Sequence, residues 1–177
     1  MKRREFLLGG AGAFLGWLAF PACAKSKEED VVAAEPSSGF TKLQKSKAEW
    51  RKVVSEDRYS VLFEAGTERP FSSPLNGEKR SGTFLCAACY LPLFSSDSKF
   101  DSGTGWPSFF RALEGRVGTR RDFKLVLPRT EYHCARCGGH QGHVFTDGPP
   151  PTGLRYCNNG VALEFVPDGQ SLPELRT

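Results

Sequence analysis

Two pairs of cysteines with the spacing C-x-x-C constrain the fold of this chain more than any other feature. They are Cys86-Ala-Ala-Cys89 and Cys134-Ala-Arg-Cys137, with 44 residues between them. Two such turns, brought together, supply the four thiolates of a closed tetrahedral zinc site. The separation is longer than in common zinc ribbons, but the entropy cost of loop closure grows only with the logarithm of length. The pattern therefore favours one structural zinc ion, with no open coordination position for catalysis.

Other uses of these cysteines stay open at this point. The pairs could form disulfides in an oxidising compartment, or one pair could act as a dithiol redox motif. A third set combines the second pair with two histidines at even spacing: Cys134, Cys137, His140 and His143. That set would leave the first pair without a role, and histidine ligands of zinc fingers normally follow their cysteines after a longer gap.

The first 24 residues have the layout of an export signal. A basic start precedes an apolar stretch over residues 6–20 and a small-residue ending that contains Cys23. Arg3-Arg4 before the apolar stretch resembles the twin-arginine type, whose substrates cross the membrane already folded. An ordinary signal that happens to hold two arginines is the alternative. We expect a periplasmic or otherwise exported protein, with the signal or a lipid at Cys23 as its only membrane contact.

The remaining chain is expected to form one domain. Residues 25–41 are charged and small, without an apolar run to bury, which is typical of a flexible linker. The domain should span residues 42–168, and residues 169–177 should form a C-terminal tail. This length supports a single core. We expect a monomer.

Charge argues against a nucleic-acid partner. The whole chain has a net charge of +4, and its first 24 residues hold three basic side chains and one acidic side chain. The remainder therefore carries 21 basic and 19 acidic side chains, or +2, and the two signs are interspersed. A surface that binds nucleic acid usually clusters its Lys and Arg residues on one element.

Hydrophobic patterning predicts short helices followed by an antiparallel β domain. Trp50 and Val54 recur at helical spacing, and Val61 and Leu62 continue the pattern after Ser55, a capping residue. From Gly82 onward the sequence consists of short apolar and aromatic runs separated by Gly, Pro, Asn and Asp. The runs are TFLC, PLFSS, KFD, KLVL, TEYHC, HVFTD, LRYC and VALEFV.

Cys157 stands apart from the paired cysteines. Strand alternation places it on one face with Arg155 and Asn159, and the apolar residues at 161–165 continue the same parity. We expect this face to point inward unless Gly160 makes a bulge. A buried structural cysteine is the alternative. A guanidinium and an amide are poor core neighbours, and a nearby cation stabilises a thiolate, so the pattern favours a reactive cysteine.

Two further segments hold candidate site residues. His140 and His143 lie in the glycine-containing segment CGGHQGHVF, and each alone could be a surface histidine. Trp106 lies between a glycine and a proline in GTGWPS. A tryptophan held in such a loop belongs to an ordinary core less often than one in a strand.

Several segments together resemble the B-type methionine sulfoxide reductases, which are peptide methionine-(R)-S-oxide reductases. The segments are ERPF, CAAC followed by PLF, KFDSGTGWPSF and CARCGGHQGHVFTDGPPPTGLRYCNNGVALEF. They run in order from about Lys42 to Pro167. The resemblance implies a mainly β fold of two antiparallel sheets with short N-terminal helices, and a structural zinc on the paired cysteines Cys86, Cys89, Cys134 and Cys137.

The resemblance also implies a set of site residues. Cys157 is implied as the catalytic nucleophile, and Trp106 as the wall that packs the methyl group of the substrate. The pocket is implied to be shaped by His140, His143, Asp147, Arg155 and Asn159. We expect the Asp147 carboxylate to orient a histidine, as carboxylates do elsewhere.

The chemistry implied is the reduction of methionine-(R)-sulfoxide in oxidised proteins. The Cys157 thiolate attacks the sulfoxide sulfur while a histidine or a bound water protonates the departing oxygen, and Cys157 is left as a sulfenic acid. Many relatives carry a resolving cysteine in the sequence S-G-C-G-W, where this chain has Thr104. We therefore expect an external reductant, a thioredoxin-like protein or a small thiol, and no internal disulfide.

Overall fold

The computed structural model of the protein describes residues 39–124 and 128–177. The expected signal, with Cys23, and the expected linker up to residue 38 lie outside these ranges. Within them, no helix has the length and apolar character that crossing a bilayer requires. Phe40, at the end of the expected linker, packs against the core, and the Arg116 guanidinium lies 5.3 Å from the centre of its ring. The folded part therefore begins before residue 42.

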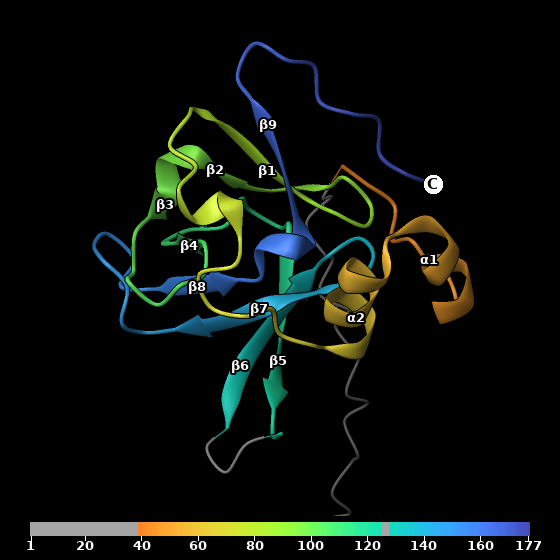
Figure 1. The fold of residues 1–177 in the computed structure, drawn as a ribbon, viewed down its shortest axis with the longest axis horizontal. Helices are drawn as coiled ribbons and strands as arrows, with labels where there is room; N and C mark the ends of the chain where they lie inside the picture. The colour runs from red at the N-terminus through yellow and green to blue at the C-terminus, as the bar shows by residue number, and fades with distance from the viewer. Residues whose placement is uncertain (1–38, 125–127) are drawn as a thin grey trace, which may run out of the picture. The chain divides into compact units, whose positions relative to one another are not determined.

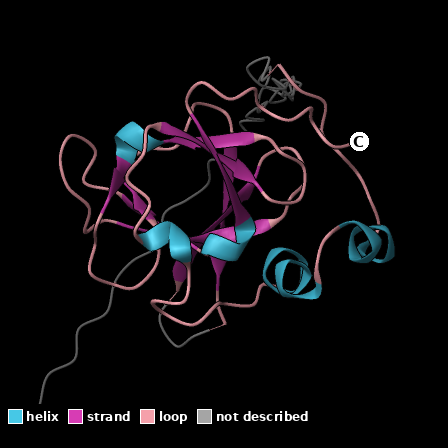
Figure 2. Cartoon of the chain, turned by 45° about the horizontal axis from the view of Figure 1, so that its top comes forward, coloured by secondary structure: helices cyan, strands magenta, loops and turns pink. Residues whose placement is uncertain are grey.

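Both predicted helices are present. Helix α1 spans Lys47–Val53 and begins with a capping box, in which Ser46 and Glu49 bind each other's backbone N–H groups. Helix α2 spans Glu56–Glu64, with Ser55 at its N-cap as predicted. Figure 2 shows the two helices lying beside the strands, and α2 packs against the strand that carries His140 and His143.

The strands form two antiparallel sheets, which confirms the predicted mainly β fold (Figure 1). The three-stranded sheet has the order β2 (Pro92–Ser95), β1 (Gly82–Cys86), β9 (Leu163–Pro167). The six-stranded sheet has the order β3 (Lys99–Phe100), β4 (Ser108–Phe109), β8 (Arg155–Asn158), β7 (His140–Phe145), β6 (Arg129–Cys134), β5 (Val117–Asp122). Three 3-10 turns, η1 to η3, join these elements: Pro74–Asn76, Ser96–Ser98 and Gly160–Ala162.

The prediction that the apolar residues at 161–165 continue the strand face of Cys157 is wrong. The 3-10 turn η3 interrupts the chain after β8, and β9 continues in the other sheet. On β8, the core side holds Tyr156, which packs against the core, and Asn158, which is fully buried and accepts a hydrogen bond from Tyr132. Cys157 is half-buried and lies on the opposite face. That face opens onto the site described below.

An aromatic core joins the two sheets. The Phe94 ring on β2 stacks on Phe109 of β4 at 4.2 Å, and Phe84 on β1 meets the same ring at 4.9 Å. Tyr132 and Tyr156 continue the cluster edge-to-face at 5.2 Å. Each such pair contributes about 0.5–1.5 kcal/mol beyond the burial of its apolar area. Aromatic side chains therefore hold together the sheets that carry the two cysteine pairs.

The C-terminal tail returns to the first cysteine pair. The Arg176 guanidinium donates to the carbonyl of Ala88 at 3.0 Å, and its backbone N–H donates to the carbonyl of Cys89 at 3.2 Å. Arg136, inside the second pair, donates to the carbonyls of Arg176 at 2.7 Å and Cys89 at 3.3 Å. Two arginines thus tie the tail to both cysteine turns.

Candidate active site and metal centre

The four paired cysteines come together in one cluster, with one pair from each sheet. Cys86 ends β1 of the three-stranded sheet, and Cys134 ends β6 of the six-stranded sheet. All four sulfur atoms lie within 4.8 Å of one another. The Sγ atoms of Cys86 and Cys137 are 3.6 Å apart, and those of Cys89 and Cys134 are 3.5 Å apart.

The two cysteine turns have the same backbone geometry. The residue after each second cysteine has a positive φ, 63° at Tyr90 and 73° at Gly138. Its N–H donates back to the first cysteine of the pair, over 2.8 Å to the Cys86 carbonyl and 2.9 Å to the Cys134 carbonyl. Each turn therefore directs two sulfur atoms to one side.

These distances suit a tetrahedral metal ion and not disulfides. Four thiolates about 2.3 Å from a zinc ion lie about 3.8 Å from one another, whereas a disulfide needs about 2.05 Å. Cys86, Cys89 and Cys134 are fully buried, which argues against a dithiol that meets a partner protein. The alternative set with His140 and His143 is wrong because both rings bind carboxylates. The cluster could hold one metal ion.

Cys157 occupies the middle of the six-stranded sheet. It lies on β8 directly opposite Ser108 of β4 and His143 of β7. Its half-buried side chain lines a hollow of about 120 Å³, called here the Cys157 hollow, together with Trp106, Arg129, His143, Phe145 and Asn159. A volume this small accommodates the end of one side chain, since whole ligands of drug size occupy pockets of roughly 300–1,000 Å³.

Gly142 allows β7 to approach β8 beside the cysteine. A Cβ at this position would lie 1.9 Å from the carbonyl oxygen of Cys157. Any side chain would therefore separate the two strands and displace His143 from its place opposite Cys157. This contact explains the glycine between the two histidines in HQGH.

Burial dominates the protonation state of Cys157. It raises the pKa of the thiol above its ordinary value, and the cation of Arg155 and the hydroxyl of Thr104 offset only part of this effect. The Asp147 carboxylate raises the same pKa further. As predicted, Arg155 by itself lowers the pKa of Cys157. Burial has the larger effect, so the pKa as a whole is raised. The resting side chain is a thiol at neutral pH.

Asp147 binds Arg155 and does not orient a histidine. Its two carboxylate oxygens accept from Nε and from a terminal nitrogen of Arg155, both at 2.9 Å. The guanidinium also lies 4.3 Å from the centre of the Phe145 ring. The expectation for Asp147 was wrong because the end of β7 places it beside the start of β8, away from both histidines.

Asp122 at the end of β5 orients His143. Its carboxylate lies 2.7 Å from Nε2 of His143 and also accepts from Arg129 at 2.8 Å. The backbone N–H of Lys124, followed by these two side chains, holds the pKa of Asp122 well below its usual range. An ionised carboxylate can only accept, so Nε2 of His143 carries the proton and Nδ1 is left for the hollow.

His140 lies behind His143, and its partner is Glu131. The side chain is 2% exposed, its Nδ1 lies 2.8 Å from the Glu131 carboxylate, and its ring centre is 5.5 Å from that of His143. Burial raises the pKa of Glu131, but hydrogen bonds from Arg120 and His140 outweigh it and leave the pKa lowered. Burial lowers the pKa of His140, so this ring is neutral near pH 7.

Asn159 and Glu68 hold the loop that carries Trp106. The Asn159 side chain accepts from the backbone N–H of Glu68 at 3.1 Å and donates to the carbonyl of Gln141 at 3.0 Å. The Glu68 carboxylate accepts hydrogen bonds from the backbone N–H groups of Gly160 and Val161. The backbone carbonyl of Glu68 accepts from Nε1 of Trp106 at 3.2 Å. Asn159 therefore helps to position Trp106, through Glu68, in addition to lining the Cys157 hollow.

Comparison with known proteins identifies the family. The SelR domain matches residues 54–167 of this chain. The chain belongs to the SelR family. Among its relatives are proteins named peptide methionine sulfoxide reductase MsrB from Agrobacterium fabrum, 53% identical over 127 residues, and from Pseudomonas putida, 52% identical over 127 residues. The aligned part covers 71% of this chain in both cases, and 94% and 96% of those proteins. A relative of the same name from Methanosarcina barkeri is 52% identical, over 70% of this chain and 87% of that protein.

In this SelR domain, the structure divides the predicted site residues into three groups. Trp106, His143 and Asn159 line the hollow with Cys157, whereas His140 lies one layer behind it. Arg155 and Asp147 do not line that hollow; with Thr104 they line a separate surface depression.

Three carboxylates that hold the site of this SelR domain, those of Asp122, Glu131 and Glu68, are not apparent from the sequence. Asp122 and Glu131 were missed because their strand partners are set by sheet register, with Asp122 opposite Arg129 and Glu131 opposite His143. Glu68 belongs to the segment ERPF, which contributes to the family resemblance, but the sequence does not indicate which groups its carboxylate binds.

The ion pair beside Cys157 can be tested through the pH dependence of thiol alkylation in the SelR domain. Arg155→Met should raise the pH of half-maximal alkylation of Cys157 by about one unit, because it removes the cation that favours the thiolate. Asp147→Asn should lower it, because that carboxylate raises the pKa of Cys157. Iodoacetamide labelling of the Cys157 peptide, followed by mass spectrometry, measures both. Shifts in the same direction would mean that only the broken ion pair matters, and would contradict this electrostatic account.

Proposed function

We propose that this protein reduces methionine-(R)-sulfoxide in oxidised proteins to methionine, with Cys157 as the nucleophile. The observation that carries the proposal is the Cys157 hollow. A thiol, a tryptophan and a carboxylate-bound histidine meet there in a space that suits one side-chain end. The relatives named peptide methionine sulfoxide reductase support the same reaction.

The first step transfers the sulfoxide oxygen to the cysteine. The sulfur of Cys157 attacks the sulfoxide sulfur, the S–O bond of the substrate breaks, and two electrons pass from the cysteine to the methionine sulfur. The oxygen, with the thiol proton, then moves to the Cys157 sulfur to give a sulfenic acid, the bond that the attack formed between the two sulfur atoms breaks, and methionine leaves with that electron pair. Because the resting group is a thiol, its proton is available for the departing oxygen. His143 is the group we assign to that transfer, since its Nδ1 is left for the hollow.

Recognition of the substrate follows from the same residues. The face of Trp106 offers a polarisable surface to the methyl group and sulfur, and sulfur–aromatic contacts are favourable by about 0.3–1.5 kcal/mol. Asn159 and Glu68 fix this ring, and Asp122 fixes His143. A fixed apolar wall and a fixed histidine, which relays the thiol proton to the departing oxygen, together distinguish the two sulfoxide epimers.

The sulfenic acid is reduced by an external thiol. Among the described residues, every cysteine other than Cys157 belongs to the four-cysteine cluster, and the Cys157 sulfur has hydrogen-bond partners in the side chains of Thr104 and Arg155, neither of which is a thiol. An incoming thiol attacks the sulfenic sulfur, water leaves, and a second thiol of the donor releases Cys157 from the mixed disulfide. A thioredoxin-like protein or a small dithiol supplies both thiols.

We also propose zinc as the metal of the four-cysteine cluster. Thiolate ligands, a closed tetrahedral set and sulfur spacings near those of a zinc site support this choice. Gln141 donates to the sulfur of Cys86 at 3.4 Å, in the manner of outer groups that support metal ligands. The ion joins the two sheets and takes no part in the reaction.

The compartment is proposed from the signal in the sequence. Residues 1–24 direct the chain to the periplasm or to another exported location, and twin-arginine export would let the metal be bound before the thiols meet an oxidant. The protein acts there as a monomer on oxidised proteins.

A kinetic comparison of sulfoxide epimers tests the proposed function. With dithiothreitol as reductant, the protein should reduce the R epimer of N-acetyl-methionine sulfoxide and leave the S epimer essentially unchanged. Chiral chromatography of the remaining substrate measures the selectivity. Equal consumption of both epimers, or consumption of neither, would show the proposal to be wrong.

A further inference from the structure

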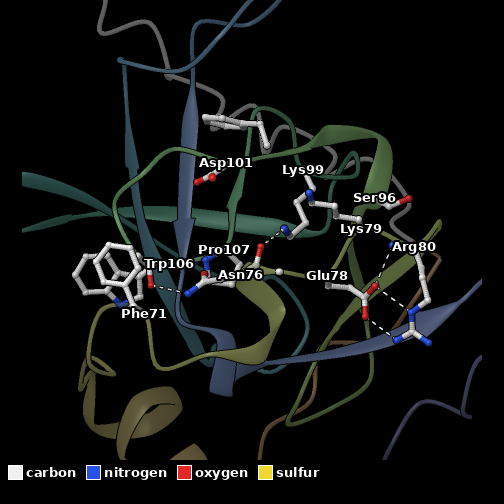
Figure 3. A pocket seen from close by; sticks show the side chains of 13 residues that line it. Phe71, Asn76, Glu78, Lys79, Arg80, Ser96, Lys99, Asp101, Trp106 and Pro107 are labelled. Atoms are coloured by element: carbon white, nitrogen blue, oxygen red, sulfur yellow. Dashed lines mark hydrogen bonds and ion pairs between the residues drawn. The ribbon is translucent and has the colours of Figure 1, made fainter.

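A second hollow adjoins the proposed substrate site on the far side of Trp106. It has a volume of about 630 Å³, about five times that of the Cys157 hollow, and Trp106 lines both. We call it the Phe71 groove, after the aromatic residue that lines it beside the tryptophan. In Figure 3, Phe71 and Trp106 stand at one end of the groove, Glu78 and Arg80 stand at the other, and Asp101 and Lys99 lie between them. A side chain bound at Cys157 therefore leaves its own backbone beside this groove.

Phe71 is an unusual residue to find at a surface. Its side chain is 73% exposed, and its backbone has a φ of 62°. Leaving a phenylalanine in water forgoes the free energy of its burial. A positive φ is also strained for a side chain with a bulky Cβ substituent, and such strain persists where the surrounding structure imposes it, often at binding sites.

The surrounding structure holds Phe71 firmly in this conformation. Its backbone N–H donates to the carbonyl of Gly105 at 2.7 Å, and Asn76 donates to the same carbonyl at 2.9 Å. A Cβ at Gly105 would lie 2.8 Å from the Phe71 nitrogen and 2.9 Å from a carbon of its ring. The glycine before Trp106 thus lets the Phe71 turn close against the tryptophan loop. Phe71 is an exposed ring on a fixed backbone.

We propose that Phe71 binds an apolar side chain next to the methionine sulfoxide in the substrate protein, so that the enzyme prefers sulfoxides with apolar neighbours. The inference rests on the proposed function and adds a subsite to it. Phe71 and Trp106 both line the groove and Trp106 also lines the Cys157 hollow, so the sulfoxide would contact Trp106 and its neighbour in the substrate would contact Phe71. A methionine commonly stands among apolar residues, because it is itself a core side chain.

The charges of the groove do not favour a strongly charged partner. Beyond Phe71 and Trp106, the groove is lined by three cationic side chains, Lys79, Arg80 and Lys99, and two anionic ones, Glu78 and Asp101, which leaves a net charge of +1. The Arg80 guanidinium is bound to Glu78, and Lys99 donates to the carbonyl of Asn76 at 3.0 Å. The charged part of the groove suits the solvated backbone of an extended peptide. Discrimination between substrate sequences therefore depends on Phe71.

The test compares three R-sulfoxide substrates with dithiothreitol as reductant. They are N-acetyl-methionine sulfoxide, a pentapeptide with leucine on both sides of the sulfoxide, and the same peptide with serine on both sides. The variants are Phe71→Ala and Phe71→Gly, and glycine keeps the left-handed backbone without strain. Leu172→Ala is the matched control, since it removes an exposed apolar side chain, 47% exposed, from the C-terminal tail.

The wild type and the control should have roughly fivefold to twentyfold higher kcat/KM for the leucine peptide than for the serine peptide. Both Phe71 variants should lose this preference and keep full activity on N-acetyl-methionine sulfoxide. Absence of a preference in the wild type, or an equal loss on all three substrates, would overturn the inference. No activity of the wild type on any substrate would instead refute the proposed function.

Discussion

Replacing Cys157 by serine should abolish sulfoxide reduction and leave the protein folded and metal-bound. The loss should be at least about 10⁴-fold, because a serine hydroxyl cannot take up the sulfoxide oxygen as a sulfenic acid does. Cys157 is half-buried and lies outside the metal cluster. The free energy of unfolding should therefore change by less than about 1 kcal/mol.

Activity on the R-sulfoxide, urea unfolding and metal content of the purified variant together measure this result. Full metal with a normal unfolding midpoint shows that the loss is chemical. Retention of more than a few per cent of the activity would mean that another group performs the reaction.

Replacing Cys134 by serine should have the opposite consequence and destroy the fold. A structural zinc site contributes about 10–16 kcal/mol of apparent binding free energy, which is as large as the whole stability of a typical domain, about 5–15 kcal/mol. The cluster also joins the three-stranded sheet, through Cys86, to the six-stranded sheet, through Cys134. The variant should be largely unfolded at 25 °C, and chelation of the wild-type metal should have the same effect.

Circular dichroism during titration with a strong chelator, alongside an assay of released zinc, measures this second effect. Cys157→Ser provides the matched control, since it makes the same atomic change outside the cluster. Cys134→Ser that stays folded with an ordinary unfolding midpoint would contradict a structural metal. If it stayed folded and lost only activity, a redox role for the cysteine pairs would be the better account.

Local patterns in the sequence were sufficient for the helices, the cysteine turns and most strands. Ser55 predicts the start of α2, and each C-x-x-C pair predicts a turn, because the start of a helix and the geometry of a turn depend on neighbouring residues. Strands β4 and β5 were missed, and the predicted run KLVL lies, apart from Lys124, outside the described residues. Strand β4 has only two residues, too few for a pattern. Strand β5 is longer. Its sequence VGTRRD has no apolar alternation, since one face is exposed and the other binds the charged side chains of β6.

The partners of the site residues could not be predicted in the same way. The carboxylates that bind His143 and His140 are 21 and 9 residues away in the sequence, and sheet register alone brings them into contact. The direction of the Cys157 pKa likewise depends on burial, which outweighs the adjacent Arg155. Asp147 was assigned to the wrong partner because it lies nearer to His143 than to Arg155 in the sequence, whereas the fold brings it to the arginine.

The most direct test of the account is a single turnover without reductant. Wild-type protein mixed with excess N-acetyl-methionine-(R)-sulfoxide should release one methionine derivative per chain. Mass spectrometry with a sulfenic-acid-specific reagent should then find the label on Cys157, with no disulfide at that residue. A stoichiometric product with Cys157 unmodified, a disulfide that includes Cys157, or no product at all would contradict the central claim that this sulfur takes the substrate's oxygen.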